Sequence, residues 1–170
     1  MEIVHTAEVE TTIGLCCLAT TERGLAYLQL PRESGRGLCG WLRVRAPESK
    51  TLEAFAPNRI AIGQLLEYLE GKRTKFDIPI DLRGTPFQLS VWSALLEIPY
   101  GETRSYQQIA NAIGRPRAVR AVGAANGANP VGIVVPCHRV IAADGSLHGY
   151  GGGLDLKARL LAMEGKGLLL

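Results

Sequence analysis

The residue pair best suited to covalent chemistry is Cys137-His138, which follows the apolar stretch 131–135, predicted as a strand. A thiolate is a strong nucleophile, but a thiol with an ordinary pKa of about 8.5 is only a few per cent ionised at neutral pH. A neighbouring imidazole can accept the thiol proton. Because adjacent side chains of an extended strand point apart, the pair needs a turn or a bridging water. Cys137 is therefore a candidate nucleophile, with a structural cysteine as the alternative.

Glu164 is a candidate third member of this group. The pattern predicts a last helix over 155–164, in which Leu156, Leu160 and Glu164 share one face. A carboxylate in that place can accept a hydrogen bond from His138 and orient its ring. The alternative is a solvated glutamate in the last turn of the helix.

The other cysteines and histidines predict no metal site. Cys16 and Cys17 are adjacent, Cys39 is isolated, and no Cys-x-x-Cys pair or histidine ligand spacing occurs. We therefore expect these three cysteines to be small core or surface residues, and no metal.

A basic segment that contains helix start and stop signals includes Cys137 and the residues before it. Residues 103–143 contain no Asp or Glu but five arginines, namely Arg104, Arg115, Arg117, Arg120 and Arg139. Ser105 and Gln108 have the spacing of a capping box, Gly114 and Pro116 break the helix near Ile113, and a second helix is predicted over 117–126. This pattern is typical of a helix-turn-helix. The second helix is rich in Ala and Gly, which favours close approach to a DNA minor groove; tight packing inside the protein is the alternative.

The remainder predicts an ordinary globular chain of two parts. Of 170 residues, 46% are hydrophobic and 21% are charged, and no stretch resembles a secretory signal or a membrane span, so an intracellular protein is expected. The N-terminal third predicts strands at 13–19, 24–30 and 42–44, then a helix over 59–70 that Asn58 caps and that buries one face, Ile60, Leu65, Leu66 and Leu69. Residues 77–86 mark a domain boundary. A helix with one buried stripe follows, formed by Phe87, Val91, Trp92, Leu95 and Leu96.

Several motifs together resemble one known family. They are FQLSVW at 87–92, IPYGETRSYQQIA at 98–110, RAVGAANGANP at 120–130, NPVGIVV at 129–135, PCHRV at 136–140 and GYGGG at 149–153. In this order they resemble the O6-alkylguanine-DNA alkyltransferases, also called methylated-DNA–protein-cysteine methyltransferases. The resemblance covers most of residues 84–165.

The resemblance implies a role for each matching residue. Cys137 takes the alkyl group, His138 accepts its proton through a water, Glu164 holds His138, and Asn129 braces the turn. Tyr106 pushes the target phosphate and donates a proton to guanine N3, and Arg120 fills the gap left by the flipped nucleotide. Further DNA contacts are expected at Ser105, Gln107, Arg115, Ala125 and Gly127, and the pocket is expected to be lined by Gly132, Val140, Tyr150 and Gly151. Gly151 stands where some members have a serine and Gly132 where some have a proline.

The implied fold is α/β (α+β) with two domains. Residues 1–80 would form a ribonuclease-H-like domain with a small antiparallel sheet and a helix, and residues 81–170 a mostly helical, winged-helix-like domain. The implied activity is irreversible transfer of the alkyl group from O6-alkylguanine, and from O4-alkylthymine, in double-stranded DNA to Cys137 after base flipping. No cofactor is expected, and the protein is expected to be a cytoplasmic monomer, at the nucleoid if bacterial.

Three other functions fit parts of the pattern. An alkyltransferase-like protein would recognise lesions without repair, but such proteins lack the cysteine of the PCHR motif. A transcription regulator would need long side chains on its recognition helix to read bases. A Cys-His hydrolase would turn over many times, whereas an alkyltransferase stops after one reaction.

Overall fold

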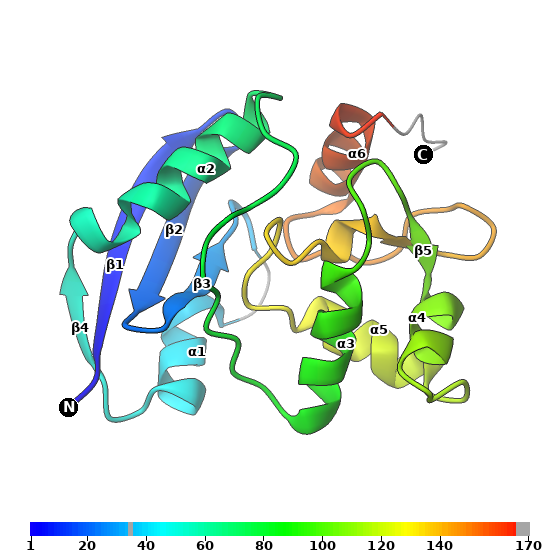
Figure 1. Cartoon of the computed structure of the whole chain (residues 1–170), viewed down its shortest axis with the longest axis horizontal. Coiled ribbons are helices and arrows are strands. Elements are labelled where there is room, and N and C mark those ends of the chain that lie inside the picture. The colour runs from blue at the N-terminus through cyan, green and yellow to red at the C-terminus, as the bar shows by residue number, and fades with distance from the viewer. Residues whose placement is uncertain (34–35, 166–170) are drawn as a thin grey trace. The chain divides into compact units, whose positions relative to one another are not determined.

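The computed structural model describes residues 1–33 and 36–165. The chain divides into two compact units, Met1–Arg83 and Gly84–Leu170 (Figure 1). Within the described ranges, no helix has both the length and the apolar character needed to cross a bilayer.

The first unit is built on a four-stranded mixed sheet. Its strands are β1 (Ile3–Thr11), β2 (Gly14–Thr21), β3 (Gly24–Gln29) and β4 (Lys50–Glu53), in the order β3-β2-β1-β4. β1 and β3 pair with β2 in antiparallel fashion, but β4 runs parallel to β1. The prediction of an antiparallel sheet is therefore wrong at this edge. All four residues of β4 are exposed, so the strand has no hydrophobic alternation that sequence patterning could detect.

Residues 79–81 run along the other edge of this sheet. The Leu25 N–H donates to Pro79 O at 3.0 Å, and the Asp81 N–H donates to Leu25 O at 2.9 Å. The approach is so close that a Cβ atom on Gly24, whose φ is +138°, would lie 2.3 Å from Pro79 O. Only glycine fits there.

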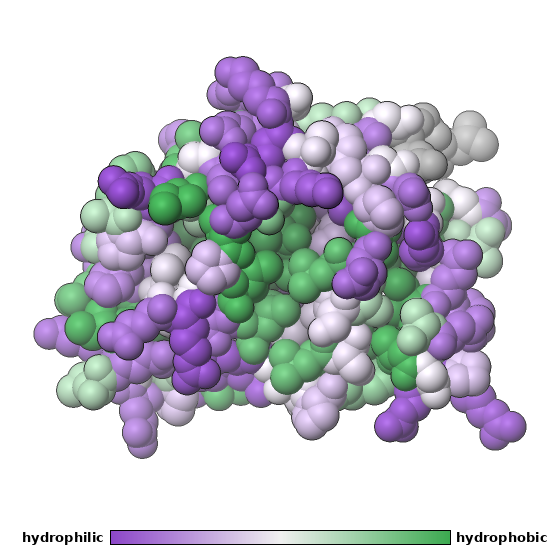
Figure 2. All heavy atoms as spheres, viewed as in Figure 1, coloured by the Kyte–Doolittle hydropathy of each residue, from purple (hydrophilic) through white to green (hydrophobic). Residues whose placement is uncertain are grey.

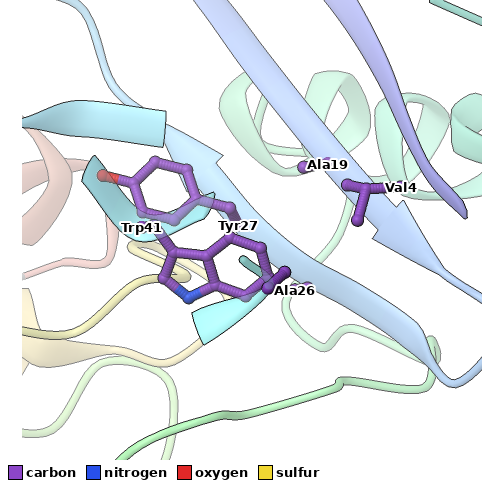
Figure 3. Packing of buried hydrophobic residues seen from close by; sticks show 6 residues of the cluster. Val4, Ala19, Ala26, Tyr27 and Trp41 are labelled. Atoms are coloured by element: carbon purple, nitrogen blue, oxygen red, sulfur yellow. The ribbon is translucent and has the colours of Figure 1, made fainter. Parts of the chain in front are cut away.

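Two helices accompany the sheet. The 42–44 run, predicted as a strand, lies instead in α1 (Gly37–Arg45), where Gly40 and Trp41 are buried. Three apolar residues are too few to distinguish the two periodicities. The Trp41 ring packs against that of Tyr27, with centroids 5.9 Å apart, in a cluster that also contains Val4, Ala19, Ala26 and Ala46 (Figure 3).

The helix predicted over 59–70 is observed as α2 (Arg59–Leu69), preceded by a short 3₁₀ helix η1 (Ala56–Asn58). Asn58 does not cap it through its side chain. Its amide donates to His5 O and Ala54 O, and its Oδ1 accepts from Thr20, so this buried residue ties the helix start to the sheet. Ile60, predicted to be buried, is 58% exposed.

The second unit is mostly helical. It contains α3 (Pro86–Leu96), α4 (Tyr106–Ala112), α5 (Val119–Gly127) and α6 (Leu154–Met163), with a 3₁₀ helix η2 (Cys137–Arg139). β5 (Arg104–Ser105) and β6 (Val140–Ile141) form a short parallel pair. The stripe predicted for α3 is narrower than expected: Val91, Trp92 and Leu95 are buried, Phe87 is half-buried and Leu96 is 43% exposed.

α4 and α5 form the predicted helix-turn-helix. The Ser105 hydroxyl accepts from the Gln108 N–H at 3.1 Å, and the Gln108 side chain accepts from the Ser105 N–H at 2.8 Å, which completes the capping box. Gly114, with φ +72°, follows the C-cap residue Ile113. The Trp92 indole of α3 donates to Ala125 O of α5 at 2.9 Å, which anchors the second helix.

Candidate active site

The segment before Cys137 is a tight turn, not the predicted strand. The Val134 N–H donates to Gly132 O at 2.9 Å around Ile133, whose φ is +71°. This is a γ-turn with positive φ, a rare and strained conformation for a β-branched residue. An apolar run of this length reads as a strand because nothing in the residue types reports the turn.

Asn129 braces this turn, as the resemblance implies. Its Nδ2 donates to Val135 O at 2.8 Å, and its Oδ1 accepts from the Val131 N–H at 3.0 Å. One side chain therefore closes both ends of a five-residue loop. Such over-determination is what allows a strained turn to persist.

Cys137 begins η2 directly after the turn and is 6% exposed. Its N–H donates to Val135 O at 2.8 Å, and its carbonyl accepts from Asn126 Nδ2 of α5 at 3.3 Å. The 3₁₀ helix supplies the change of direction that Cys137 and His138 require. The thiol position is thus fixed by backbone contacts on both sides.

His138 and Glu164 form a buried pair. The His138 Nε2 lies 2.9 Å from Glu164 Oε1, and both side chains are wholly buried. Glu164 follows the last residue of α6. Because its side chain is buried, the alternative of a solvated glutamate is wrong. Burial lowers the pKa of His138, although the hydrogen bond with Glu164 opposes this effect. Since a carboxylate only accepts, Nε2 carries the hydrogen and Nδ1 is the nitrogen able to take a proton.

Arg139 completes this cluster and does not belong to the basic surface to which its sequence position assigned it. Its guanidinium binds Glu164 in bidentate fashion, at 2.9 Å from Nε to Oε2 and 2.8 Å from Nη2 to Oε1. Nη1 donates to Ile98 O at 2.7 Å, and the guanidinium lies 5.7 Å from the centroid of the Tyr100 ring. Arg139 is 7% exposed. Its partner lies 25 residues away, so its sequence neighbours carried no signal of this role.

Lys157 is a second residue that the sequence analysis missed. Its side chain is wholly buried on α6, where Nζ donates to Val140 O at 2.6 Å and to His148 O at 2.9 Å. Burial lowers its pKa to about 8, partly opposed by the negative charge of Cys137. Its position three and seven residues before Leu160 and Glu164, on their helix face, is the signal that could have identified it.

Of the predicted pocket residues, Val140 is itself held by Lys157, and Tyr150 and Gly151 follow shortly after His148, the other residue that Lys157 holds. Gly132 and Val140 are buried, while Tyr150 and Gly151 are half-buried. The Tyr106 hydroxyl donates to His148 O at 3.3 Å. Burial raises the pKa of Tyr106, and the charge of Cys137 adds to this, so Tyr106 retains its proton at neutral pH near the thiol.

The residues predicted to bind DNA fall into two groups. Gln107, Arg115, Arg120 and Gly127 are exposed, and so is Arg117, which was not among the predicted contacts. Figure 2 shows that the side chains projecting furthest from the region that α4 and α5 occupy in Figure 1 are hydrophilic. Ala125 is 3% exposed and faces the interior, so the prediction that it contacts DNA is wrong.

Two further polar residues of this region are occupied within the fold. The Ser105 hydroxyl is used by its cap, and Arg104 pairs with Glu102 at 2.9 Å. Of the five arginines in the acid-free segment, three are therefore exposed: Arg115, Arg117 and Arg120. Over residues 1–33 and 36–165, no three His, Cys, Asp or Glu side chains gather into a group that could hold a metal.

Comparison with known proteins places this site in a family. Residues 86–166 match the family model described as "6-O-methylguanine DNA methyltransferase, DNA binding domain". Relatives include the inducible methylated-DNA–protein-cysteine methyltransferase of Bacillus subtilis, 50% identical over 86% of this chain and 82% of its own. The methyltransferase of Methanosarcina barkeri is 48% identical over 92% of this chain and 94% of its own.

Solved structures agree. The crystal structure of Mycobacterium tuberculosis OGT in complex with DNA is similar with a TM-score of 0.81 and 45% identity, covering 94% of this chain and 92% of that one. The enzyme from Pyrococcus kodakaraensis, 21% identical with a TM-score of 0.56 over 96% of this chain and 99% of its own, shares the fold. The chain therefore belongs to the methylated-DNA–protein-cysteine methyltransferases, the family that its motifs resemble.

Proposed function

We propose that this protein repairs alkylated DNA by transferring the alkyl group from O6-alkylguanine, and from O4-alkylthymine, to Cys137. The observation that carries this proposal is the fixed thiol of Cys137 beside the buried His138–Glu164 pair. The DNA complex of the Mycobacterium tuberculosis relative supports double-stranded DNA as the partner.

The reaction is a displacement at the alkyl carbon. Cys137 gives its proton, through a water, to His138 Nδ1, while Nε2 keeps its hydrogen bond to Glu164. The thiolate forms a bond to the alkyl carbon, the bond from that carbon to O6 breaks, and the electron pair goes to the guanine. Tyr106 donates a proton to guanine N3 and is reprotonated as His138 releases the proton it took from Cys137, so that the charges balance. The product is a neutral thioether, which water does not cleave, so each molecule acts once.

The target base must leave the duplex because a base within the stack cannot reach a thiol that is 6% exposed. The exposed Arg120 takes the place of the flipped nucleotide, and Gln107, Arg115 and Gly127 contact DNA, with Ser105 at the start of the first helix. Gly132, Val140, Tyr150 and Gly151 line the pocket for the base. DNA binding and alkyl acceptance both belong to residues 81–170, and one chain carries every proposed group. The protein thus acts as a monomer, which we place in the cytoplasm, at the nucleoid in a bacterial host.

The decisive experiment uses a duplex with a single O6-methylguanine. We expect the Cys137 peptide to gain the mass of one methyl group, with the reaction complete at one equivalent of DNA. Cys137→Ala should gain nothing, and Cys39→Ala, which removes an exposed cysteine of the first unit, should react like the wild type. Continued turnover, or methylation at another residue, would contradict the proposal.

A further inference from the structure

Glu164 is shared between two cationic or potentially cationic side chains. Its Oε1 accepts hydrogen bonds from His138 Nε2 at 2.9 Å and from Arg139 Nη2 at 2.8 Å, and its Oε2 accepts one from Arg139 Nε at 2.9 Å. All three side chains are buried. Arginine remains charged in proteins, so the negative charge of Glu164 is already balanced by a bidentate partner before His138 is considered.

This arrangement determines the charge that His138 can carry. The charged groups that act on it are Lys157 on α6, Glu164 directly after α6, and Arg139 on η2. Burial, Arg139 and Lys157 lower the pKa of His138, whereas Glu164 raises it. A protonated His138 would be a second cation beside Arg139 in a site shielded from bulk solvent. Without Arg139, His138 and Glu164 would instead form a simple buried ion pair.

We propose that Arg139 is a positioning residue for alkyl transfer, holding Glu164 in place and offsetting its charge so that His138 stays a neutral proton acceptor. This inference rests on the proposed roles of Cys137 and His138. Arg139 does not touch the reacting atoms. It acts through Glu164, and through Ile98 O it also anchors the end of α3 beside the site.

The test follows the protonation of His138 and the pH dependence of transfer. Histidine labelled with ¹³C reports the charge of His138 by NMR, assigned with His138→Gln. In the wild type we expect His138 to remain neutral from pH 8 down to pH 6. In Arg139→Met we expect its pKa to rise, because the guanidinium no longer offsets the charge of the Glu164 carboxylate beside it. The single-turnover methyl-transfer rate at pH 7 should then fall about tenfold or more, and recover at higher pH.

Two further variants separate charge from packing. Arg139→Lys keeps a positive charge and should leave the His138 titration near that of the wild type. The double variant Arg139→Met with Glu164→Gln removes the unbalanced carboxylate, so His138 should return to neutral and the acid limb of the rate profile should move back. Arg73→Met, at an exposed ion pair of the first unit, is the matched control and should change neither readout.

The outcomes distinguish this inference from the proposed function. An imidazolium at His138 in the wild type at pH 7 would overturn the inference without any variant, even if Arg139→Met does not fold. An equal loss of rate at every pH in Arg139→Met, with His138 still neutral, would also overturn it. In both cases methylation of Cys137 in the wild type would leave the proposed function standing. Absence of that methylation would remove the proposed function itself.

Discussion

At the residue scale, the site is a set of buried polar side chains that hydrogen-bond to one another or to backbone carbonyls. Glu164 accepts from His138 and Arg139, while Lys157 donates to two backbone carbonyls, Val140 O and His148 O. Carbonyl dipoles solvate an ammonium less well than water, which is why burial dominates its pKa. The buried lysine is therefore a cost to folding that the site retains.

The lowered pKa of Lys157 makes the free energy of unfolding depend on pH. The pKa of Lys157 is lowered from its ordinary value of 10.5 to about 8, so at pH 7 both the folded and the unfolded states carry the proton. Between about pH 8 and 10.5 the unfolded state binds more protons than the folded state, and stability rises with pH. We expect the free energy of unfolding of the wild type, relative to Lys157→Met, to increase over this range and to stay level below pH 7.

Urea unfolding at a series of pH values checks this expectation. Lys72→Met removes an exposed lysine paired with Glu70 and is the control, for which the difference from the wild type should remain small. A difference for Lys157→Met that is level from pH 7 to pH 10.5 would show that Lys157 titrates normally.

At the element scale, the thiol depends on a loop that one side chain holds. Asn129 satisfies a backbone N–H and a backbone carbonyl at the two ends of the γ-turn, and both Val131 and Val135 are wholly buried. Loss of the amide would leave the Val131 N–H unsatisfied and the Val135 carbonyl with the Cys137 N–H as its donor. It would also release Ile133 from a conformation that the chain does not adopt unaided.

We expect Asn129→Ala to lower the free energy of unfolding by about 1–3 kcal/mol. We also expect methyl transfer to slow by more than the loss of folded protein accounts for. Urea unfolding and single-turnover rates at one pH measure the two effects. Asn111→Ala, at an exposed amide of α4 that accepts from Gln107, should cost no more than about 0.5 kcal/mol. An unaltered rate in a folded Asn129→Ala protein would show that the turn holds itself.

The sequence could predict mainly the features whose causes lie nearby in the chain. The helix-turn-helix was predictable because its cap at Ser105 and its break at Gly114 lie within the segment they shape. The link from His138 to Glu164 was predictable from helical spacing and the family resemblance. The burial of Arg139 was not, because its partner Glu164 lies 25 residues away. The γ-turn lies within an apolar run that reads as a strand, although the resemblance implied that Asn129 braces a turn. β4 was missed because no side chain of that strand is buried.

At the scale of the whole molecule, the net charge of +3 is too small to explain affinity for DNA. The distribution matters more, since the turn and the second helix of the helix-turn-helix expose Arg115, Arg117 and Arg120 close together in sequence, within a stretch that contains no acid. Such a local field binds the phosphate backbone with a strong dependence on salt. The exposed positive charge that we propose to bind DNA is therefore local, and the rest of the chain stays near neutrality.

Removal of one of these arginines should appear in the salt dependence. In a Cys137→Ala background, which binds without reacting, we expect Arg115→Ala to weaken binding to any duplex and to reduce the slope of log affinity against log salt by about one. Fluorescence anisotropy at four salt concentrations measures this slope. Arg73→Ala in the same background should leave it unchanged, and an equal slope for Arg115→Ala would remove this residue from the phosphate contacts.

The position of β4 has a consequence for the solution behaviour of the protein. β4 ends the sheet with an outer row of backbone groups, and such an edge can recruit a strand from another molecule and begin aggregation. Here the edge is only four residues long and carries the charges of Lys50 and Glu53 around a single apolar side chain, Leu52. Short length and charge both discourage intermolecular strand pairing, so these residues act as gatekeepers of the sheet and contribute nothing to its core.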